Sequence, residues 1–287
     1  MKLFIIKILL FSGMIFLINL GVKLLLDNLY FKEYNEVHLN ARTYLLSDSH
    51  GAAIGEFKDS TIYNFSSPSD SYFDIETKLK YLIRNSKVER VLLTVDEHTL
   101  SPYRKSLNNL DRSVYFSSKE DFLNFFSFVW HRYVKYNLVL LNPKYGPIIK
   151  NYLKSLVGIT SANLNEKSWN EVPVNQRIKF SLKRYADQFV FDHSSKGLSN
   201  SLKRIIYLSK TNNIELIGIK FPITEEYRQI IGEKNYRADS FLNKNGFEIY
   251  NFNSKELSDP KYFKDQDHLN QLGANIFKEA ILDSLSY

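Results

Sequence analysis

Two short polar motifs contain the residues whose types could carry out nucleophilic chemistry. Ser47-Asp-Ser-His-Gly51 follows a short apolar run, and Asp265-Gln-Asp-His268 precedes the last amphipathic segment of the chain. A serine hydroxyl is a weak nucleophile until an imidazole removes its proton and a carboxylate orients that imidazole. If the two motifs meet in the fold, His268 would activate Ser49, and Asp265 would orient and stabilise the imidazolium.

The elements that must bring these motifs together alternate between strands and helices. Short apolar runs with strand character occur at residues 43–47, 61–65, 89–95, 214–220 and 247–252. Helical spacing of apolar residues occurs at 72–85, 200–211, 225–231 and 271–285. This alternation predicts a three-layer, flavodoxin-like α/β fold with a parallel sheet of about five strands. Ligands bind at the carboxyl ends of the strands in such sheets, and both motifs follow predicted strands.

The same motifs resemble the signatures of the SGNH (GDSL-like) hydrolase superfamily, over residues 43–98 and 210–285. Ser47-Asp48-Ser49 is similar to the Gly-Asp-Ser signature, with serine in place of glycine. Residues 265–273 are similar to the closing signature, an Asp-x-x-His followed by Leu-Asn and a glycine. The resemblance implies a catalytic triad of Ser49, His268 and Asp265, acyl-ester chemistry through an acyl-serine intermediate, and neither a cofactor nor a bound metal.

The resemblance also implies an oxyanion hole. Residues 64–71 follow the outline of the second signature and place Ser69 at its glycine, so the backbone N–H groups of Ser49 and Ser69 would be donors. The third signature falls on residues 94–97 and places Asp96 where the family has an asparagine. An ionised carboxylate cannot stabilise an oxyanion. Either Asp96 is protonated, or His98 donates instead, or that part of the hole is missing.

Two further residues are candidates for substrate contact. His50 follows the predicted nucleophile, and Lys220 ends the fourth predicted strand, where it could contact an anionic substrate. A solvated lysine at a strand end is the simpler interpretation of Lys220.

The N-terminal segment predicts a membrane anchor. Residues 3–26 are mostly apolar and charged only at Lys7 and Lys23, and about 20 such residues cross a bilayer. No small-residue cleavage pattern follows, which favours an anchor over a removed signal peptide. The positive-inside rule places the N-terminus in the cytoplasm, and the remainder in the periplasm or cell exterior. We expect an anchor over 1–28, a stem over 29–42 and an SGNH-like domain over 43–287.

The stretch from about 99 to 198 interrupts the alternation of strands and helices. It contains an aromatic run at residues 122–130, and it is predicted to be a mainly helical insertion. We interpret the aromatic run as a local core rather than as a membrane-facing or lid surface.

Composition excludes several classes of chemistry. The 287 residues contain no cysteine, which excludes disulfides, Cys-ligated zinc, iron–sulfur clusters and thiol nucleophiles. The formal net charge is +7, and removing residues 1–28 takes away three Lys and one Asp and leaves +5. The basic residues are dispersed, and an exported domain would not meet nucleic acid, so we expect no nucleic-acid partner.

An anchor joined to an SGNH-like domain is similar to proteins that acylate or deacylate cell-envelope polymers, such as the alginate O-acetylation proteins and the DltD type. The resemblance implies an acyl donor and a polysaccharide as substrates, and a multi-pass membrane O-acyltransferase as partner. The anchor would contact the lipid bilayer through residues 3–26.

Two alternatives from other classes remain open. A domain with Ser47 in place of the signature glycine could bind glycan or act as a scaffold without catalysis. A metal-dependent phosphoesterase is the other, because Asp48-Ser-His50, Asp96-Glu-His98 and the 265–268 motif each place Asp and His together.

Overall fold

The structure is a computed structural model that describes residues 1–58, 61–158, 168–254 and 256–285. The chain forms two compact units. One contains Met1–Val37 and Val114–Asn163, and the other contains His38–Ser113 and Leu164–Tyr287. Residues 99–113 and 168–198 therefore pack with the second unit, so the separate insertion is shorter than the predicted 99–198. Residues 159–167 of that prediction lie outside the described residues.

The second unit is built on a sheet of five parallel strands, and we call it the sheet unit. The strands are β1 (Thr43–Leu46), β2 (Ile62–Asn64), β3 (Arg90–Thr94), β4 (Glu215–Lys220) and β5 (Ile249–Asn251). Their order is β2-β1-β3-β4-β5, which is the flavodoxin-like order. Each strand lies within one of the five predicted segments, so the predicted α/β fold is confirmed. The order reverses between β1 and β3, where doubly wound sheets bind ligands.

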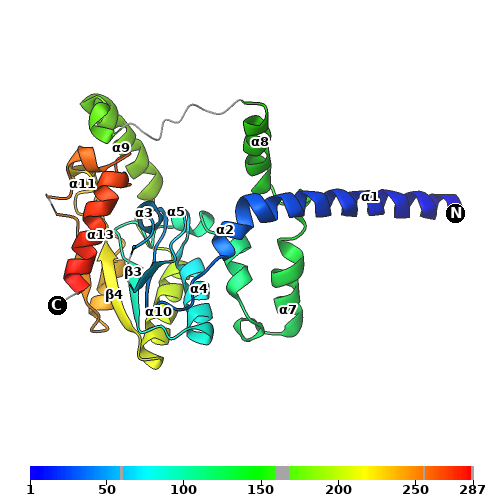
Figure 1. Ribbon diagram of the computed structural model, residues 1–287, viewed down its shortest axis with the longest axis horizontal. Helices are drawn as coiled ribbons and strands as arrows, with labels where there is room; N and C mark the ends of the chain where they lie inside the picture. The colour runs from blue at the N-terminus through cyan, green and yellow to red at the C-terminus, as the bar shows by residue number, and fades with distance from the viewer. Residues whose placement is uncertain (59–60, 159–167, 255, 286–287) are drawn as a thin grey trace. The chain divides into compact units, whose positions relative to one another are not determined.

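Helices cover both faces of the sheet (Figure 1). α4 (Tyr72–Asn85) and α10 (Lys196–Thr211) pack together on one face, and α13 (Gln271–Leu285) covers the other. The sheet unit also contains the helices α3 (Ser49–Ala53), α5 (Tyr103–Ser106), α6 (Leu110–Ser113), η7 (Trp169–Glu171), α9 (Val174–Gln188), α11 (Glu225–Ile231), α12 (Ala238–Asn243) and η8 (Pro260–Tyr262). All four predicted helical segments are helices in the structure.

The core beneath α13 explains why the central strands contain consecutive apolar residues. Leu45, Leu92 and Ile217 are register partners on β1, β3 and β4, and they are buried against Phe277 and Ile281 of α13. Side chains alternate between the two faces of a strand, and both faces of this sheet are covered. Burial on both faces holds the strand ends, and the motifs that follow them, in fixed positions.

The first unit, which we call the anchor unit, contains the N-terminal helix. α1 (Lys2–Leu26) continues through the π-helical turn η1 (Asp27–Phe31) into α2 (Lys32–Asn35). The helix is long and apolar enough to span a membrane, with a mean hydropathy of 2.4 over its apolar window. All of the first 18 residues are exposed, whereas partial burial begins at Asn19.

The remainder of the anchor unit consists of short helices, of which η5 and α8 pack against the end of α1 and η1. They are η2 (Val114–Phe116), η3 (Lys119–Asp121), α7 (Phe125–Val129), η4 (Trp130–Lys135), η5 (Val139–Leu141) and α8 (Tyr145–Leu156). Leu26 and Phe31 form a small core with Val139 and Tyr145. The helical character of this region is as predicted. The interpretation of residues 122–130 as a local core was wrong, because Phe125, Phe126 and Trp130 are exposed.

Candidate active site

Ser49 lies at the turn between β1 and α3, at the carboxyl end of the strand. Asp48 caps the helix by accepting a hydrogen bond from the His50 N–H at 3.0 Å. Gly51 makes this turn possible, because a Cβ there would come within 2.5 Å of both Ser47 Cβ and Ser66 Oγ. The close contact fixes the start of α3 against β1, and it holds the Ser49 side chain at the edge of the sheet.

His268 reaches Ser49 from a loop 219 residues further along the chain. Its Nε2 lies 2.8 Å from Ser49 Oγ, and its Nδ1 lies 2.9 and 3.0 Å from the two carboxylate oxygens of Asp265. With a neutral ring, the Ser49 hydroxyl donates to Nε2 and the Nδ1–H donates to Asp265. The structure therefore brings together the three residues that the sequence analysis selected, in the order that a serine triad requires.

The loop of residues 262–270 holds His268 in place. The Asp265 carboxylate accepts hydrogen bonds from the backbone N–H groups of Asp267 and His268, at 3.1 and 2.8 Å. Gly273 lets the start of α13 approach this loop, since a Cβ at that position would lie 2.2 Å from the Tyr262 carbonyl oxygen. The closing motif thus combines an acid that orients the histidine with a glycine that permits close packing.

A second carboxylate also faces His268, and the sequence analysis did not select it. Asp267 is buried, and its Oδ1 lies 3.1 Å from His268 Nδ1. Its Oδ2 accepts hydrogen bonds from Arg184 Nε at 2.8 Å and from Gln188 Nε2 at 3.2 Å, both on α9. The position beside His268 in the sequence was the available signal, but a sequence cannot show that Arg184 holds this carboxylate.

The two carboxylates change the acid–base properties of His268. Burial opposes the charged form, but the negative charge of Asp267 and the hydrogen bond to Asp265 outweigh it, and they raise the pKa of His268 to about 8. Asp267 itself remains ionised, because the charges of His268 and Arg184 overcome its burial and hold its pKa well below the usual range. A base must be neutral to accept the Ser49 proton, so this pKa sets the pH at which the base works.

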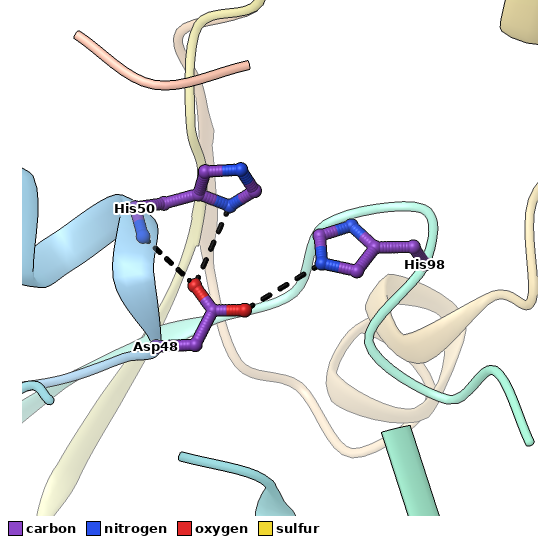
Figure 2. Close-up of side chains that lie close together, drawn as sticks. All are labelled: Asp48, His50 and His98. Atoms are coloured by element: carbon purple, nitrogen blue, oxygen red, sulfur yellow. Dashed lines mark hydrogen bonds and ion pairs between the residues drawn. The ribbon is translucent and has the colours of Figure 1, made fainter. Parts of the chain in front are cut away.

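Asp48, His50 and His98 form a buried cluster of titratable side chains (Figure 2). The Asp48 carboxylate faces His50 Nδ1 at 3.4 Å and His98 Nε2 at 3.5 Å, and Arg104 lies 3.1 Å from its Oδ2. Burial opposes the charge on both Asp48 and His50. Their mutual attraction, supported by other charged neighbours, nevertheless holds the pKa of Asp48 well below and that of His50 well above the usual values. Burial lowers the pKa of His98, so His98 is neutral.

This cluster has the donor types that a metal ion requires. Asp48, His50 and His98 offer ligand atoms close together, as do His50, Asp267 and His268. In the first group, however, Arg104 occupies the side of the Asp48 carboxylate and opposes a second cation there. In the second group a metal ion would compete with the contacts between His268 and its two carboxylates. The geometry fits a network of ion pairs better than a metal centre.

Among the residues predicted for the oxyanion hole, Ser69 has a suitable backbone conformation, whereas the side chains of Asp96 and His98 are paired with other groups. Ser69 adopts a φ of 71°, a left-handed conformation that usually requires glycine, which agrees with its position at the glycine of the second signature. Asp96 accepts hydrogen bonds from the Phe221 N–H at 2.8 Å and the Thr94 hydroxyl at 3.1 Å, and it faces His50 Nδ1 at 2.9 Å. A carboxylate with these partners is an acceptor rather than the donor that an oxyanion needs. His98 is directed at Asp48.

The two predicted substrate contacts do not have the expected surroundings. His50 is 3% exposed and lies among the carboxylates of Asp48, Asp96 and Asp267. Its ring therefore pairs with buried acidic groups and is not open to a substrate. Lys220 is also buried, at 8% exposed, and its Nζ pairs with Glu97 at 3.0 Å and with Asp239 at 2.7 Å. The interpretation of Lys220 as a solvated lysine was therefore wrong, and two carboxylates already neutralise the charge that was expected to meet an anionic substrate. Its position at a strand end was predicted, but its partners come from distant segments.

A surface hollow of about 270 Å³ lies beside the triad. Asp265 and Gln266 form one wall, and the other walls come from the aromatic rings of Trp169 and Phe180 and from three charged residues of α9, Lys183, Arg184 and Asp187. A hollow that combines aromatic surface with cationic side chains suits a ligand with both apolar faces and acidic or hydroxyl groups.

The fold and this site together define an α/β protein with a Ser-His-Asp arrangement at the carboxyl ends of parallel strands. No protein-family model matches the chain, and no curated protein matches it. Among solved structures, the chain is similar to a GDSL-like lipase from Bacteroides thetaiotaomicron, with 10% identity, a TM-score of 0.43, and coverage of 90% of this chain and 95% of that one. It is also similar to a proposed acylhydrolase from Bacteroides fragilis, with 9% identity, a TM-score of 0.42, and coverage of 90% and 94%. Likeness at this level does not assign an activity, which has to be argued from the site.

Proposed function

We propose that this protein is a serine acyl-ester enzyme that forms an acyl intermediate on Ser49. The observation that carries the proposal is the 2.8 Å contact between Ser49 Oγ and His268 Nε2, with Asp265 on the opposite side of the same imidazole ring. A serine outside such an arrangement is a poor nucleophile. The motif resemblance to the SGNH superfamily supports the same interpretation.

The residues act in the following order. His268 removes the Ser49 proton as Oγ attacks the acyl carbonyl, and Asp265 stabilises the imidazolium that forms. His268 then donates this proton to the departing alcohol, which leaves an acyl group on Ser49. A water molecule or a sugar hydroxyl gives up its proton to His268 and attacks the acyl carbon. The bond from the acyl carbon to Ser49 Oγ then breaks, and His268 returns the proton to Oγ, which restores Ser49. The backbone N–H groups of Ser49 and Ser69 are our candidates for stabilising the oxyanion.

The further proposal is that the acceptor or substrate is a polysaccharide of the cell envelope. The hollow beside Asp265 supports this choice, because the exposed ring of Phe180 can pack against a sugar face and Lys183 can pair with an acidic sugar. The apolar helix α1 supports attachment to the cytoplasmic membrane, with the sheet unit outside. A tethered enzyme has a raised effective concentration toward a membrane O-acyltransferase partner.

Covalent labelling of Ser49 tests the proposed nucleophile. The full chain is treated with a fluorophosphonate, and the labelled site is found by peptide mass spectrometry. We expect one adduct on Ser49, no adduct in Ser49→Ala, and an unchanged adduct in Ser66→Ala, the control at a neighbouring serine. An adduct that persists in Ser49→Ala, or wild-type complementation by that variant in cells, would contradict the proposal and favour a scaffold. Hydrolysis that is lost with a chelator but retained in Ser49→Ala would favour metal chemistry.

A further inference from the structure

The anchor unit contains a segment that is rich in aromatic and basic residues, several of which are exposed. Residues 122–158 contain nine aromatic residues, five Lys or Arg residues, and neither Asp nor Glu. The basic residues are Arg132, Lys135, Lys144, Lys150 and Lys154. A solvated surface normally mixes both signs of charge, so a segment of this length without an acidic residue indicates attraction to an anionic partner.

The apolar side chains of this segment are arranged on helix faces. Phe126, Trp130 and Tyr133 follow one another at spacings of four and three along the continuous helix formed by α7 and η4, and they are 84%, 50% and 57% exposed. In α8, the side chains of Leu153, Leu156 and the following Val157 are exposed in the same way. Helices with an exposed apolar face and basic flanking residues are typical of peptides that lie in a membrane interface.

The segment is fixed to α1 at the depth where an interface would lie. Residues 1–18 are all exposed, and at 1.5 Å per residue they extend about 27 Å, close to the roughly 30 Å of a hydrocarbon core. Contacts between α1 and the segment begin at Asn19. Its side-chain amide donates a hydrogen bond to the Asn137 carbonyl at 2.8 Å and accepts one from the Leu140 N–H at 3.3 Å. Leu26 then packs against Val139 and Tyr145.

The direction of the helices agrees with this depth. α7 and α8 run across the direction of α1, near its C-terminal end (Figure 1). If α1 crosses a bilayer, both helices therefore lie along the plane of the membrane. Exposed aromatic residues and lysines in that layer have the composition of an interfacial belt.

We propose that residues 122–158 form a membrane-contact surface, in which Phe126, Trp130 and Leu153 enter the lipid interface and the basic residues bind anionic headgroups. This surface adds a second, peripheral contact to the transmembrane helix, and it fixes the orientation of the anchor unit at the membrane. The proposal depends on α1 spanning the bilayer and is independent of the chemistry of Ser49.

Trp130 provides an intrinsic probe, because the chain contains only two tryptophans and the other, Trp169, is buried in the sheet unit. The full-length Trp169→Phe protein is reconstituted into phosphatidylcholine vesicles with or without phosphatidylglycerol, prepared with lipids brominated near the headgroup end of the acyl chain. We expect bromine to remove roughly half of the Trp130 emission, and more in the anionic vesicles than in the neutral ones, because interfacial burial brings the ring to that depth.

Two matched proteins make the measurement decisive. Trp130→Phe reports only Trp169 and should not be quenched. A protein with Trp130→Phe, Trp169→Phe and Phe11→Trp reports insertion of α1, and it should be quenched by lipids brominated deep in the chain, because residue 11 lies near the middle of the exposed stretch. If Phe11→Trp is quenched while Trp130 is unquenched and open to aqueous acrylamide, the proposal is wrong and a protein partner is the better occupant. Equal quenching in neutral and anionic vesicles would overturn the role of the basic residues.

Discussion

Asp267 Oδ1 lies 3.1 Å from His268 Nδ1, whereas the other ring nitrogen, Nε2, faces Ser49 Oγ. This relationship gives the histidine two carboxylates with different surroundings. The Asp265 side chain is 34% exposed, whereas that of Asp267 is 1% exposed and paired with Arg184. We therefore assign orientation of the imidazole to Asp265, and adjustment of its pKa to Asp267.

The first prediction concerns the pH dependence of ester hydrolysis. The base works only when His268 is neutral, and its pKa is raised to about 8, so kcat/KM should increase with pH and level off above that value. Asp267→Asn removes a negative charge that favours the imidazolium, so the apparent pKa should fall by about one pH unit or more. A pH–rate profile with an aryl ester measures both.

The exposed Asp187, on the same helix as Arg184, provides the control for this prediction. Asp187→Asn removes an acid from the hollow without touching His268, so its profile should match that of the wild type. An unchanged profile in folded Asp267→Asn would show that this carboxylate does not control the base.

The second prediction separates Asp265 from Asp267 by the size of the rate loss. Asp265→Asn presents an amide to His268 Nδ1, which removes the acceptor that holds the productive tautomer, and kcat should fall by roughly 10²–10⁴-fold at every pH. The loss in Asp267→Asn should be smaller at the optimum pH of that variant. Steady-state kinetics on the two proteins make the comparison, and equal losses would contradict the separate roles.

The third prediction concerns Gly273, at the start of α13. The new Cβ of Gly273→Ala would lie 2.2 Å from the Tyr262 carbonyl oxygen, so the loop that carries His268 must shift. We expect the free energy of unfolding to fall by about 1–3 kcal/mol, as for other overpacked sites, and activity to fall as well. Denaturant titration measures the change. Gln271→Ala, at an exposed position of the same helix, should leave stability within about 0.5 kcal/mol of the wild type.

The fourth prediction concerns Lys220. Its Nζ is paired with Glu97 and Asp239 below the surface, so Lys220→Met should lower stability, because it leaves two carboxylates without their cation. KM for an anionic ester should be unchanged. A higher KM with unchanged stability would instead restore the role in substrate binding that was expected from the sequence.

The sequence predicted the sheet because its strands are buried on both faces. The central strands contain runs of consecutive apolar residues, as in residues 91–93, and the helices between them keep a clear apolar stripe. It also predicted that Ser49 and His268 would meet, because the motifs follow strands whose carboxyl ends share one edge of a parallel sheet.

The sequence could not predict contacts that depend on the packing of distant segments. Asp267 acquires its role from Arg184, which is 83 positions away, and Lys220 is neutralised by Glu97 and Asp239. The aromatic residues 122–130 have the composition of a core. Whether they are buried depends on whether another segment packs against them, and the sequence alone does not show that tertiary contact.

The most direct test of the central claim is whether an acyl group forms on Ser49 during turnover. The full chain is mixed with 4-nitrophenyl acetate, quenched rapidly in acid and digested, and the acetylated peptide is identified by mass spectrometry. We predict acetyl-Ser49 in the wild type, trapped by the acid quench because a protonated His268 can no longer activate water for the second step. Turnover of the ester without acetyl on Ser49, or with the same acetylation in Ser49→Ala, would contradict the account.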